Sequence, residues 1–259
     1  MFQKMIQNIQ KNYYLLIVLV KRDISKKYKD SFLGLLWTFF NPLLNMIVMS
    51  VIFSTIFKKN IENFPVYMLS GRVFYDFFSK ATSEALKSIP GASQIIKKIY
   101  VPKYIITFSK VLSNFITSAI SILALVVVMV ATGAEFSINL LIIPVLFLVF
   151  FVFATGIGLM IATADVFFRD MEHIYGIILM TIMYFSAIFY PAEIIPEEYR
   201  ILLYINPMFK FVEAFRSPIY YGVLPEWDVM LYCIAVAAIA FVAGAVIFKK
   251  NQDKFIYYL

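Results

Sequence analysis

The chain has 259 residues, of which 62% are hydrophobic and 15% charged, with a mean hydropathy of +0.83 and a formal net charge of +7. Soluble domains use roughly 45–50% apolar residues, so this composition excludes an ordinary soluble protein and indicates an integral membrane protein. A single cysteine, Cys233, and a single histidine, His173, exclude an internal disulfide, a cysteine cluster and a histidine-dependent nucleophile, and we expect no metal site.

Residues 1–30 predict an amphipathic helix on the cytoplasmic surface of the membrane. Apolar side chains recur at helical spacing on one side of this segment, while lysines and amides occupy the other. The apolar positions are Phe2, Met5, Ile6, Ile9, Tyr13 and Leu16.

Crossing a bilayer takes about 20 predominantly apolar residues in a helix. Stretches that are uncharged over most of their length predict spans at about 33–57, 106–132, 138–164, 174–192 and 229–248. We expect 64–88 to be a sixth span, although charged residues recur there at every fourth position. These residues, Arg72, Asp76, Lys80 and Glu84, share one side of a helix, so they line a wet conduit or pair with one another against a neighbouring span.

Basic residues set the orientation, because lysine and arginine stay on the cytoplasmic side. Residues 1–30, the loop 87–110 and the tail 249–259 are rich in lysine, whereas 193–228 holds six acids against three bases. The sequence therefore predicts an all-α, multi-pass protein of the plasma (inner) membrane, with six spans and both termini in the cytoplasm. Small residues at Gly156, Gly158 and Ala162 and at Ala240 and Gly244 predict close packing of two spans within one subunit.

Of the two expected cytoplasmic loops, only the first has a sequence pattern that suggests a role. Residues 92–102 predict a short helix with a hydrophobic face beside a lysine pair, which is either a docking surface for a soluble partner or only a topology anchor. The loop around Arg169 and Asp170, taken alone, is a solvated turn.

The external segment 194–221 predicts two short helices, divided at Pro196 and at Asn206-Pro207, because proline ends one helix and suits the first turn of the next. Half-length helices that dip in from outside need protein or water around their ends. The alternative, a large solvated loop, would expose the apolar run 201–205.

Five stretches of the sequence, taken in order, resemble the permease subunits of type-2 ABC exporters for lipid-linked polysaccharides. They are "LVKRDISKKYKDSFLGLLWTFFNPLL", "FPVYMLSGRVFYDFF", "IIKKIYVPKYIITFSKVLSNF", "FFRDMEHI" and "FSAIFYPAEIIPEEYRILLYINPMFKFVEAFRSPIYYG". The resemblance covers nearly the whole chain. The chain departs from the family's pattern at Arg72, at Tyr75 in place of a common tryptophan and at Ala187 in place of a common proline.

The resemblance implies export of a cell-surface glycan such as an O-antigen, a teichoic acid or a capsular polysaccharide. No segment matches G-x-x-x-x-G-K-[ST], so we expect this chain to be no enzyme and to bind no cofactor; ATP and Mg would bind to two copies of a partner ATPase. Six spans are half of a typical exporter, so a homodimer is expected. We expect no nucleic acid partner.

The resemblance implies that the ATPase contacts the segment 92–102, the turn around Arg169 and Asp170, and the N-terminal helix. The residues expected to couple the chain to the ATPase are Ile95, Ile96, Lys97, Lys98, Ile99, Tyr100, Pro102, Lys103, Arg169 and Asp170. An external gate is implied at Tyr190, Pro191, Pro196, Asn206, Pro207 and Arg216.

Aromatic side chains suit a polysaccharide conduit, because ring faces stack on the apolar faces of sugars. We expect the conduit to be lined by Trp37, Phe39, Phe40 and Asn45 in the first span and by Tyr75, Asp76 and Lys80 in the second. Two other classes stay open: a secondary transporter, although we find no internal repeat, and a membrane-embedded glycan or lipid transferase.

Overall fold

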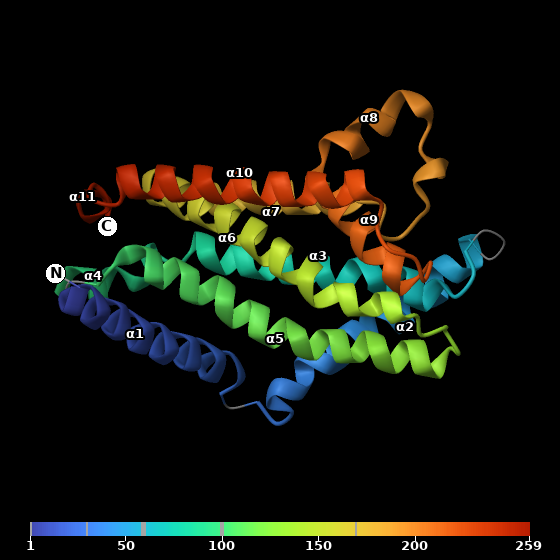
Figure 1. Ribbon diagram of the computed structural model, residues 1–259, viewed down its shortest axis with the longest axis horizontal. Coiled ribbons are helices and arrows are strands. Elements are labelled where there is room, and N and C mark those ends of the chain that lie inside the picture. The colour runs from blue at the N-terminus through green and yellow to red at the C-terminus, as the bar shows by residue number, and fades with distance from the viewer. Residues whose placement is uncertain (1, 30, 58–60, 99–100, 169) are drawn as a thin grey trace.

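The computed structural model describes residues 2–29, 31–57, 61–98, 101–168 and 170–259. Within this part of the chain the structure is helical and contains no strand, which confirms the all-α class. The long helices run along one common direction (Figure 1). The start of α1 (Phe2–Tyr28), the C-terminus and the short helix α4 (Ser93–Lys98) lie at one end of this bundle, and the end of α2 (Trp37–Phe57) and the start of α3 (Phe64–Leu86) lie at the other.

The first two long helices lie on the flank of the bundle formed by α5 and α3. Helix α1 (Phe2–Tyr28) lies along α5 (Lys103–Ala131), and the 3-10 turn Gly34–Leu36 then leads into α2 (Trp37–Phe57). This turn requires a φ of +48° at Gly34, a left-handed conformation that glycine adopts without a steric penalty. The resulting reversal separates the α1 segment from the first long apolar helix.

Helix α3 (Phe64–Leu86) is the centre of the core. It packs against α2, α5, α6 (Ile143–Phe167) and α9 (Pro207–Ile219), and most of its side chains are buried. Phenylalanines from several helices meet around it: the rings of Phe74 and Phe215 stack with centroids 3.5 Å apart, and those of Phe77 and Phe147 meet edge to face at 5.1 Å. Aromatic pairs of this kind add to the stabilisation that comes from burial alone.

In the part of the chain that the structure describes, four helical segments are both long enough and apolar enough to cross a membrane: Gly34–Phe53, Lys103–Ala131, Ile138–Phe167 and Trp227–Asn251. Helix α3 has 23 residues, about 35 Å at 1.5 Å per residue, which is long enough, but its charged stripe sets it apart from the four. Helix α7 (Met171–Tyr184) has only 14 residues. The count of six spans therefore stays a prediction.

Helix α7 ends at Tyr184, eight residues before the end that hydropathy predicted for that span. An irregular segment and the 3-10 turn Ala192–Ile194 follow, and then α8 (Glu197–Ile205) and α9. The two short helices divide at Asn206 and Pro207, where the sequence placed the boundary. Figure 1 shows α8 projecting away from the bundle while α9 runs back into it. The chain closes with α10 (Trp227–Asn251) and α11 (Phe255–Tyr258).

Helices α6 and α10 pack along their length and touch at small residues. A Cβ atom added to Gly156 would lie 2.3 Å from the carbonyl carbon of Ala240, and one added to Gly244 would lie 2.3 Å from the carbonyl oxygen of Gly156. Glycine is therefore required at both positions for the backbones to approach this closely. This contact confirms that these small residues pack within one subunit.

Replacing Gly156 by alanine should lower the free energy of unfolding by about 1–3 kcal/mol, because the new methyl group would clash with backbone atoms of α10, which cannot adopt another rotamer. Thermal unfolding of the detergent-solubilised chain measures the effect. Gly176→Ala on α7 is the matched control, since no atom lies within 4 Å of the added methyl group. Equal melting temperatures for the two variants would contradict the close contact.

Candidate functional site

The short helix α4 and the turn before it, Pro90–Ala92, form an elbow between α3 and α5. Ile96 of α4 is buried in a cluster with Ile89, Ile105 and Phe248, whereas Ile95 is 37% exposed and Lys97 and Lys98 are exposed. The elbow is therefore fixed to the bundle on one side and presents an isoleucine and two lysines on the other. This arrangement corrects the expectation for Ile96, which packs inside its own chain and is not available to a partner.

The other residues expected to contact the ATPase lie close to the elbow in sequence or around the next cytoplasmic turn. Pro102 and Lys103 are half-buried at the start of α5, and Asp170 is exposed at the start of α7. Ile99, Tyr100 and Arg169 lie outside the described residues. Lys87, at the end of α3, forms an exposed ion pair with Glu172 of α7, so the elbow and the turn before α7 lie next to one another.

Helix α1 is attached to the bundle through buried and half-buried charges. The Asp23 carboxylate, 3% exposed, accepts from the Lys110 amine of α5 at 3.0 Å and from the neighbouring Arg22 guanidinium at 2.9 Å. The Lys27 amine lies 3.0 Å from the Glu84 carboxylate of α3 and donates to the Asn114 side-chain oxygen of α5 at 2.9 Å. These contacts hold the second half of α1 against α3 and α5.

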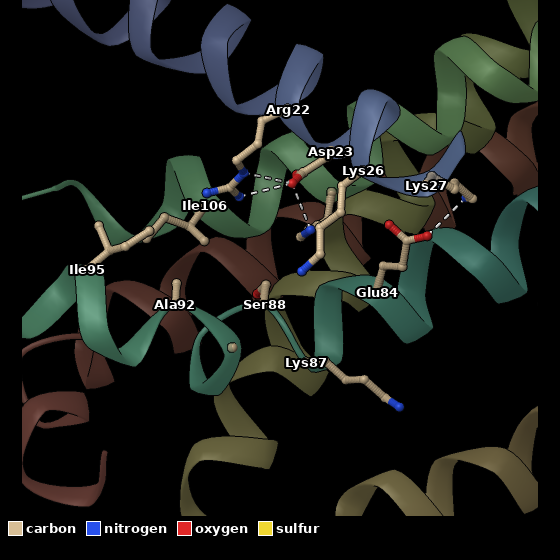
Figure 2. A pocket seen from close by; sticks show the side chains of 12 residues that line it. Arg22, Asp23, Lys26, Lys27, Glu84, Lys87, Ser88, Ala92, Ile95 and Ile106 are labelled. Atoms are coloured by element: carbon tan, nitrogen blue, oxygen red, sulfur yellow. Dashed lines mark hydrogen bonds and ion pairs between the residues drawn. The ribbon is translucent and has the colours of Figure 1, made fainter. Parts of the chain in front are cut away.

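A cavity of about 530 Å³ lies between α1, the end of α3, the elbow and α5. Figure 2 shows the charged side chains that α1 contributes to it and the Asp23 and Glu84 ion pairs beside it. Basic side chains outnumber acidic ones in its wall. The residues that line it are Arg22, Asp23, Lys26, Lys27, Glu84, Lys87, Ser88, Gly91, Ala92, Ile95, Ile106 and Lys110. Burial and then the Glu84 carboxylate raise the pKa of nearby Tyr28, so its hydroxyl keeps its proton and adds no negative charge.

At the other end of the bundle, where α7 ends, two side chains of the 206–219 segment donate hydrogen bonds to backbone carbonyl oxygens. The Asn206 amide donates to the carbonyl oxygens of Phe185 at 2.9 Å and Ile182 at 3.3 Å, while its side-chain oxygen accepts from the Met208 amide and caps α9. Asn206 also donates to the Ser186 hydroxyl at 2.9 Å. Asn206 thus joins the end of α7 to the start of α9.

Arg216 of α9 is the second of these side chains and is 6% exposed. It donates to the carbonyl oxygens of Ala187 at 3.1 Å and Ile188 at 3.4 Å, and its guanidinium carbon lies 3.7 Å from the centre of the Tyr67 ring. Ala187 has a φ of +49°, a region that residues other than glycine rarely adopt. Arg216 therefore stabilises the strained backbone at Ala187 and Ile188 through these hydrogen bonds.

The remaining residues expected at the external gate frame this irregular segment. The Tyr67 hydroxyl donates to the Tyr190 carbonyl oxygen at 3.0 Å. The Tyr190 hydroxyl in turn donates to the carbonyl oxygen of Tyr184. Pro191 and Pro196 precede the turn Ala192–Ile194 and α8, respectively, and Pro207 is the first residue of α9. Helix α8 carries exposed Tyr199, Ile201 and Tyr204, whereas its Leu203 is buried, so its apolar residues are only partly covered within the described chain.

The residues expected to line a conduit do not share one surface. Tyr75 is buried and its hydroxyl donates to the Leu179 carbonyl oxygen at 2.7 Å, so it packs between α3 and α7. Trp37, Phe40 and Asn45 are exposed on α2, and Phe39 is half-buried with its ring 5.5 Å from that of Phe40.

The charged stripe of α3 divides among three environments. Arg72 and Asp76 form an ion pair at 2.8 Å, as the spacing of four residues allows, and the Arg72 guanidinium also contacts the Met183 sulfur of α7. Lys80 is exposed. Glu84 reaches α1, as described above. The internal pairing that the sequence offered as one alternative therefore holds for the first two members only.

Comparison with known proteins places these features in a family. The family model described as "ABC-2 type transporter" matches residues 14–220. The chain is 28% identical over 243 residues to an O-antigen export system permease protein of Myxococcus xanthus, covering 93% of this chain and 94% of that protein. It is 29% identical over 254 residues to one from Klebsiella pneumoniae, with 97% of each covered. A polysialic acid transport protein of Escherichia coli is 24% identical over 236 residues, with 90% of this chain and 91% of that protein covered.

Arg216→Gln should loosen the segment between α7 and α8, because two carbonyl oxygens lose a charged donor, at a local cost of about 1.5–3 kcal/mol. Hydrogen exchange of peptides that cover 185–190 should become faster. Arg200→Gln is the control: Arg200 also donates to two backbone carbonyls, but its side chain is 33% exposed. Unchanged exchange in the Arg216 variant would show that the strained backbone is held by other contacts.

Proposed function

Because this chain belongs to the ABC-2 type transporter family, we propose that it is the permease subunit of an ATP-driven exporter of a lipid-linked cell-surface polysaccharide. The observation that carries the proposal is that polysaccharide export and transport proteins align with 90% or more of this chain. The substrate class comes from those relatives, which are described as O-antigen export and polysialic acid transport proteins. The glycan would move from the cytoplasmic side across the plasma (inner) membrane.

A partner ATPase would supply the energy and would bind ATP and Mg. The exposed face of the elbow, with Ile95, Lys97 and Lys98, is the surface we assign to it, because this face is held rigidly from behind by buried Ile96. Asp170 lies at the neighbouring cytoplasmic turn, which the Lys87–Glu172 ion pair joins to the end of α3. Movement of the ATPase would thus reach α3, α5 and α7 together.

A second copy of the chain would complete the conduit at a two-fold axis. Helix α2 supports this assignment, since only 6% of its apolar window is buried and it carries exposed Trp37, Phe40, Leu44 and Ile47. A pair of such faces would place aromatic side chains beside the path of the sugar. Asp76 and Lys80 of α3 would meet this path or the water within it, because charged groups are costly against lipid.

The α8–α9 segment would be the external gate. Its inner helix, α9, is bound to α3 and α6, whereas the apolar residues of α8 are only partly covered. The chain would sit in the membrane with both termini in the cytoplasm, in accordance with the common end that the start of α1 and the C-terminus share with α4 (Figure 1).

Reversing two charges on the elbow, with Lys97→Glu and Lys98→Glu, should weaken binding of the ATPase at least about tenfold, since opposed charges across an interface are lost. Binding is measured with the purified chain and the ATPase that copurifies with it. Lys249→Glu with Lys250→Glu at the end of α10 is the matched control, because that pair is also exposed near the cytoplasmic end. Equal loss of binding in both variants would move the docking surface away from the elbow.

Replacing Asp76 and Lys80 together by alanine should impair export while the chain still assembles with its ATPase, because these charges lie on α3 away from the elbow. The readout is ATP-dependent appearance of glycan on the far side of reconstituted vesicles. Unchanged export would remove both residues from the conduit. Transport by the chain without ATP would instead indicate a secondary transporter.

A further inference from the structure

We propose that an apolar groove between α5, α6 and α10 binds an anionic phospholipid of the surrounding membrane, with the lipid headgroup at Lys249. The groove has a volume of about 460 Å³. This phospholipid is not the transported cargo, so the inference goes beyond the proposed function, from which it takes only the assignment of this leaflet to the cytoplasmic side. The residues that line the groove are Tyr104, Phe108, Thr155, Leu159, Phe241, Ala245, Phe248, Lys249 and Gln252.

The groove lies where three apolar helices meet, at the end of the bundle that holds α4 and the C-terminus (Figure 1). Helices α5, α6 and α10 each belong to a segment that is long and apolar enough to cross a membrane. Phe241 and Lys249 are separated by about 12 Å along α10, at 1.5 Å per residue. Half of a hydrocarbon core is about 15 Å thick, so the groove fits within one leaflet.

The inner wall of the groove is unsuited to a water-soluble ligand. Phe108, Leu159 and Phe241 contribute only hydrocarbon, and Phe241 is exposed, so the groove is open to the outside of the bundle. Thr155 is buried, and its hydroxyl already donates to the Phe151 carbonyl oxygen of its own helix at 2.8 Å. A polar ligand would lose its hydrogen bonds to water here without replacement, whereas an acyl chain has none to lose.

All charge in the lining is at one end of the groove. Lys249, in the last turn of α10, is exposed, and the described part of the chain provides it with no ion-pair partner. Gln252, beside it, adds a side-chain amide that can donate a hydrogen bond. The segment 249–254 holds three lysines and one acid. A hydrocarbon groove that ends in an unpaired cation matches an amphiphile with an anionic headgroup.

A second, smaller hollow distinguishes a membrane phospholipid from a single-chain polyprenyl lipid. It has a volume of about 310 Å³ and shares Tyr104 and Phe108 with the groove. Two apolar hollows beside the same pair of aromatic rings suit a lipid with two acyl chains. Such a lipid would contact both α1, which packs on α5, and α10, which packs on α6. The residues that line the hollow are Asn12, Tyr13, Leu16, Tyr104, Ile105 and Phe108.

The headgroup assignment is tested with the detergent-solubilised full chain and its ATPase, titrated with phosphatidylglycerol or phosphatidylcholine, with bound lipid counted by native mass spectrometry. Lys249→Gln should weaken phosphatidylglycerol binding about fivefold, the factor expected for one lysine beside an anionic lipid, and should leave phosphatidylcholine binding unchanged. Lys249→Arg should bind as the wild type does. Lys250→Gln is the matched control, because Lys250 is also exposed at this helix end but does not line the groove.

The position of the acyl chains is tested with a phosphatidylglycerol that carries a photoreactive group in one chain. Ala245→Phe should fill the groove and reduce labelling of α5 and α10 at least about tenfold. Ala238→Phe is the matched control: Ala238 is exposed on the same face of α10, seven residues earlier, and lies outside the lining. This variant should be labelled as the wild type is.

Four results would overturn the inference. Equal binding by the Lys249→Gln and Lys250→Gln variants would remove the headgroup contact, and equal labelling of the Ala245→Phe and Ala238→Phe variants would remove the groove. Displacement of the label by an equal concentration of a polyprenyl diphosphate would make the groove a cargo site. Loss of labelling when two copies associate would assign the groove to the second copy.

These outcomes can be told apart from a failure of the proposed function. The ATPase should stay bound in every variant, because the groove lies away from the exposed face of the elbow. A wild-type chain that exports glycan with its ATPase but binds the two phospholipids equally overturns the phospholipid site alone. Selective phosphatidylglycerol binding by a chain that assembles with no ATPase supports the site and overturns the exporter.

Discussion

The structure depends on one constraint of the bilayer: a backbone carbonyl or amide away from water must find a partner inside the protein. Helix α7 stops at Tyr184 in the middle of an apolar run, which leaves several carbonyl oxygens without the next turn of helix. Asn206 and Arg216 provide the missing donors from α9. Because these two side chains must lie within hydrogen-bond distance of the end of α7, α9 lies inside the bundle and packs on α3. The arrangement of the external end follows from this requirement.

At the end of the bundle that holds α4, buried charges have a similar need for partners. Asp23, removed from water, is matched by the Lys110 amine and the Arg22 guanidinium, and Lys27 is matched by Glu84. Truncating one member of such a set would leave a desolvated charge behind, which is far more costly than loss of a surface pair. Helix α1 is therefore joined to α3 and α5 through a network, and the elbow that carries α4 lies next to that network.

Much of this architecture follows from local pattern in the sequence. The small residues around Gly156, Ala240 and Gly244 predicted close helix packing within one subunit, which the contact of α6 with α10 provides, and the four-residue spacing offered the Arg72–Asp76 pair as one of two alternatives. The division of the external segment at Asn206-Pro207 follows from the preference of proline for the first helical turn. What the pattern could not reveal depends on distant residues. Glu84 pairs with Lys27 of α1 and not with a residue of its own helix, and Ile96 packs inside the bundle. Helix α7 ends early although the apolar sequence continues to 192, because hydropathy carries no information on backbone conformation such as the φ of +49° at Ala187.

The contact between Gly156 and Gly244 also limits how the protein can move. Two backbones in such close contact leave no slack for sliding or twisting past one another, so α6 and α10 form a single stiff column. In a transport cycle of the kind proposed, α6 and α10 would therefore move as one unit, and a change of shape would have to come from helices that pack elsewhere. Helix α2, which packs on α3 and α5, is one such helix.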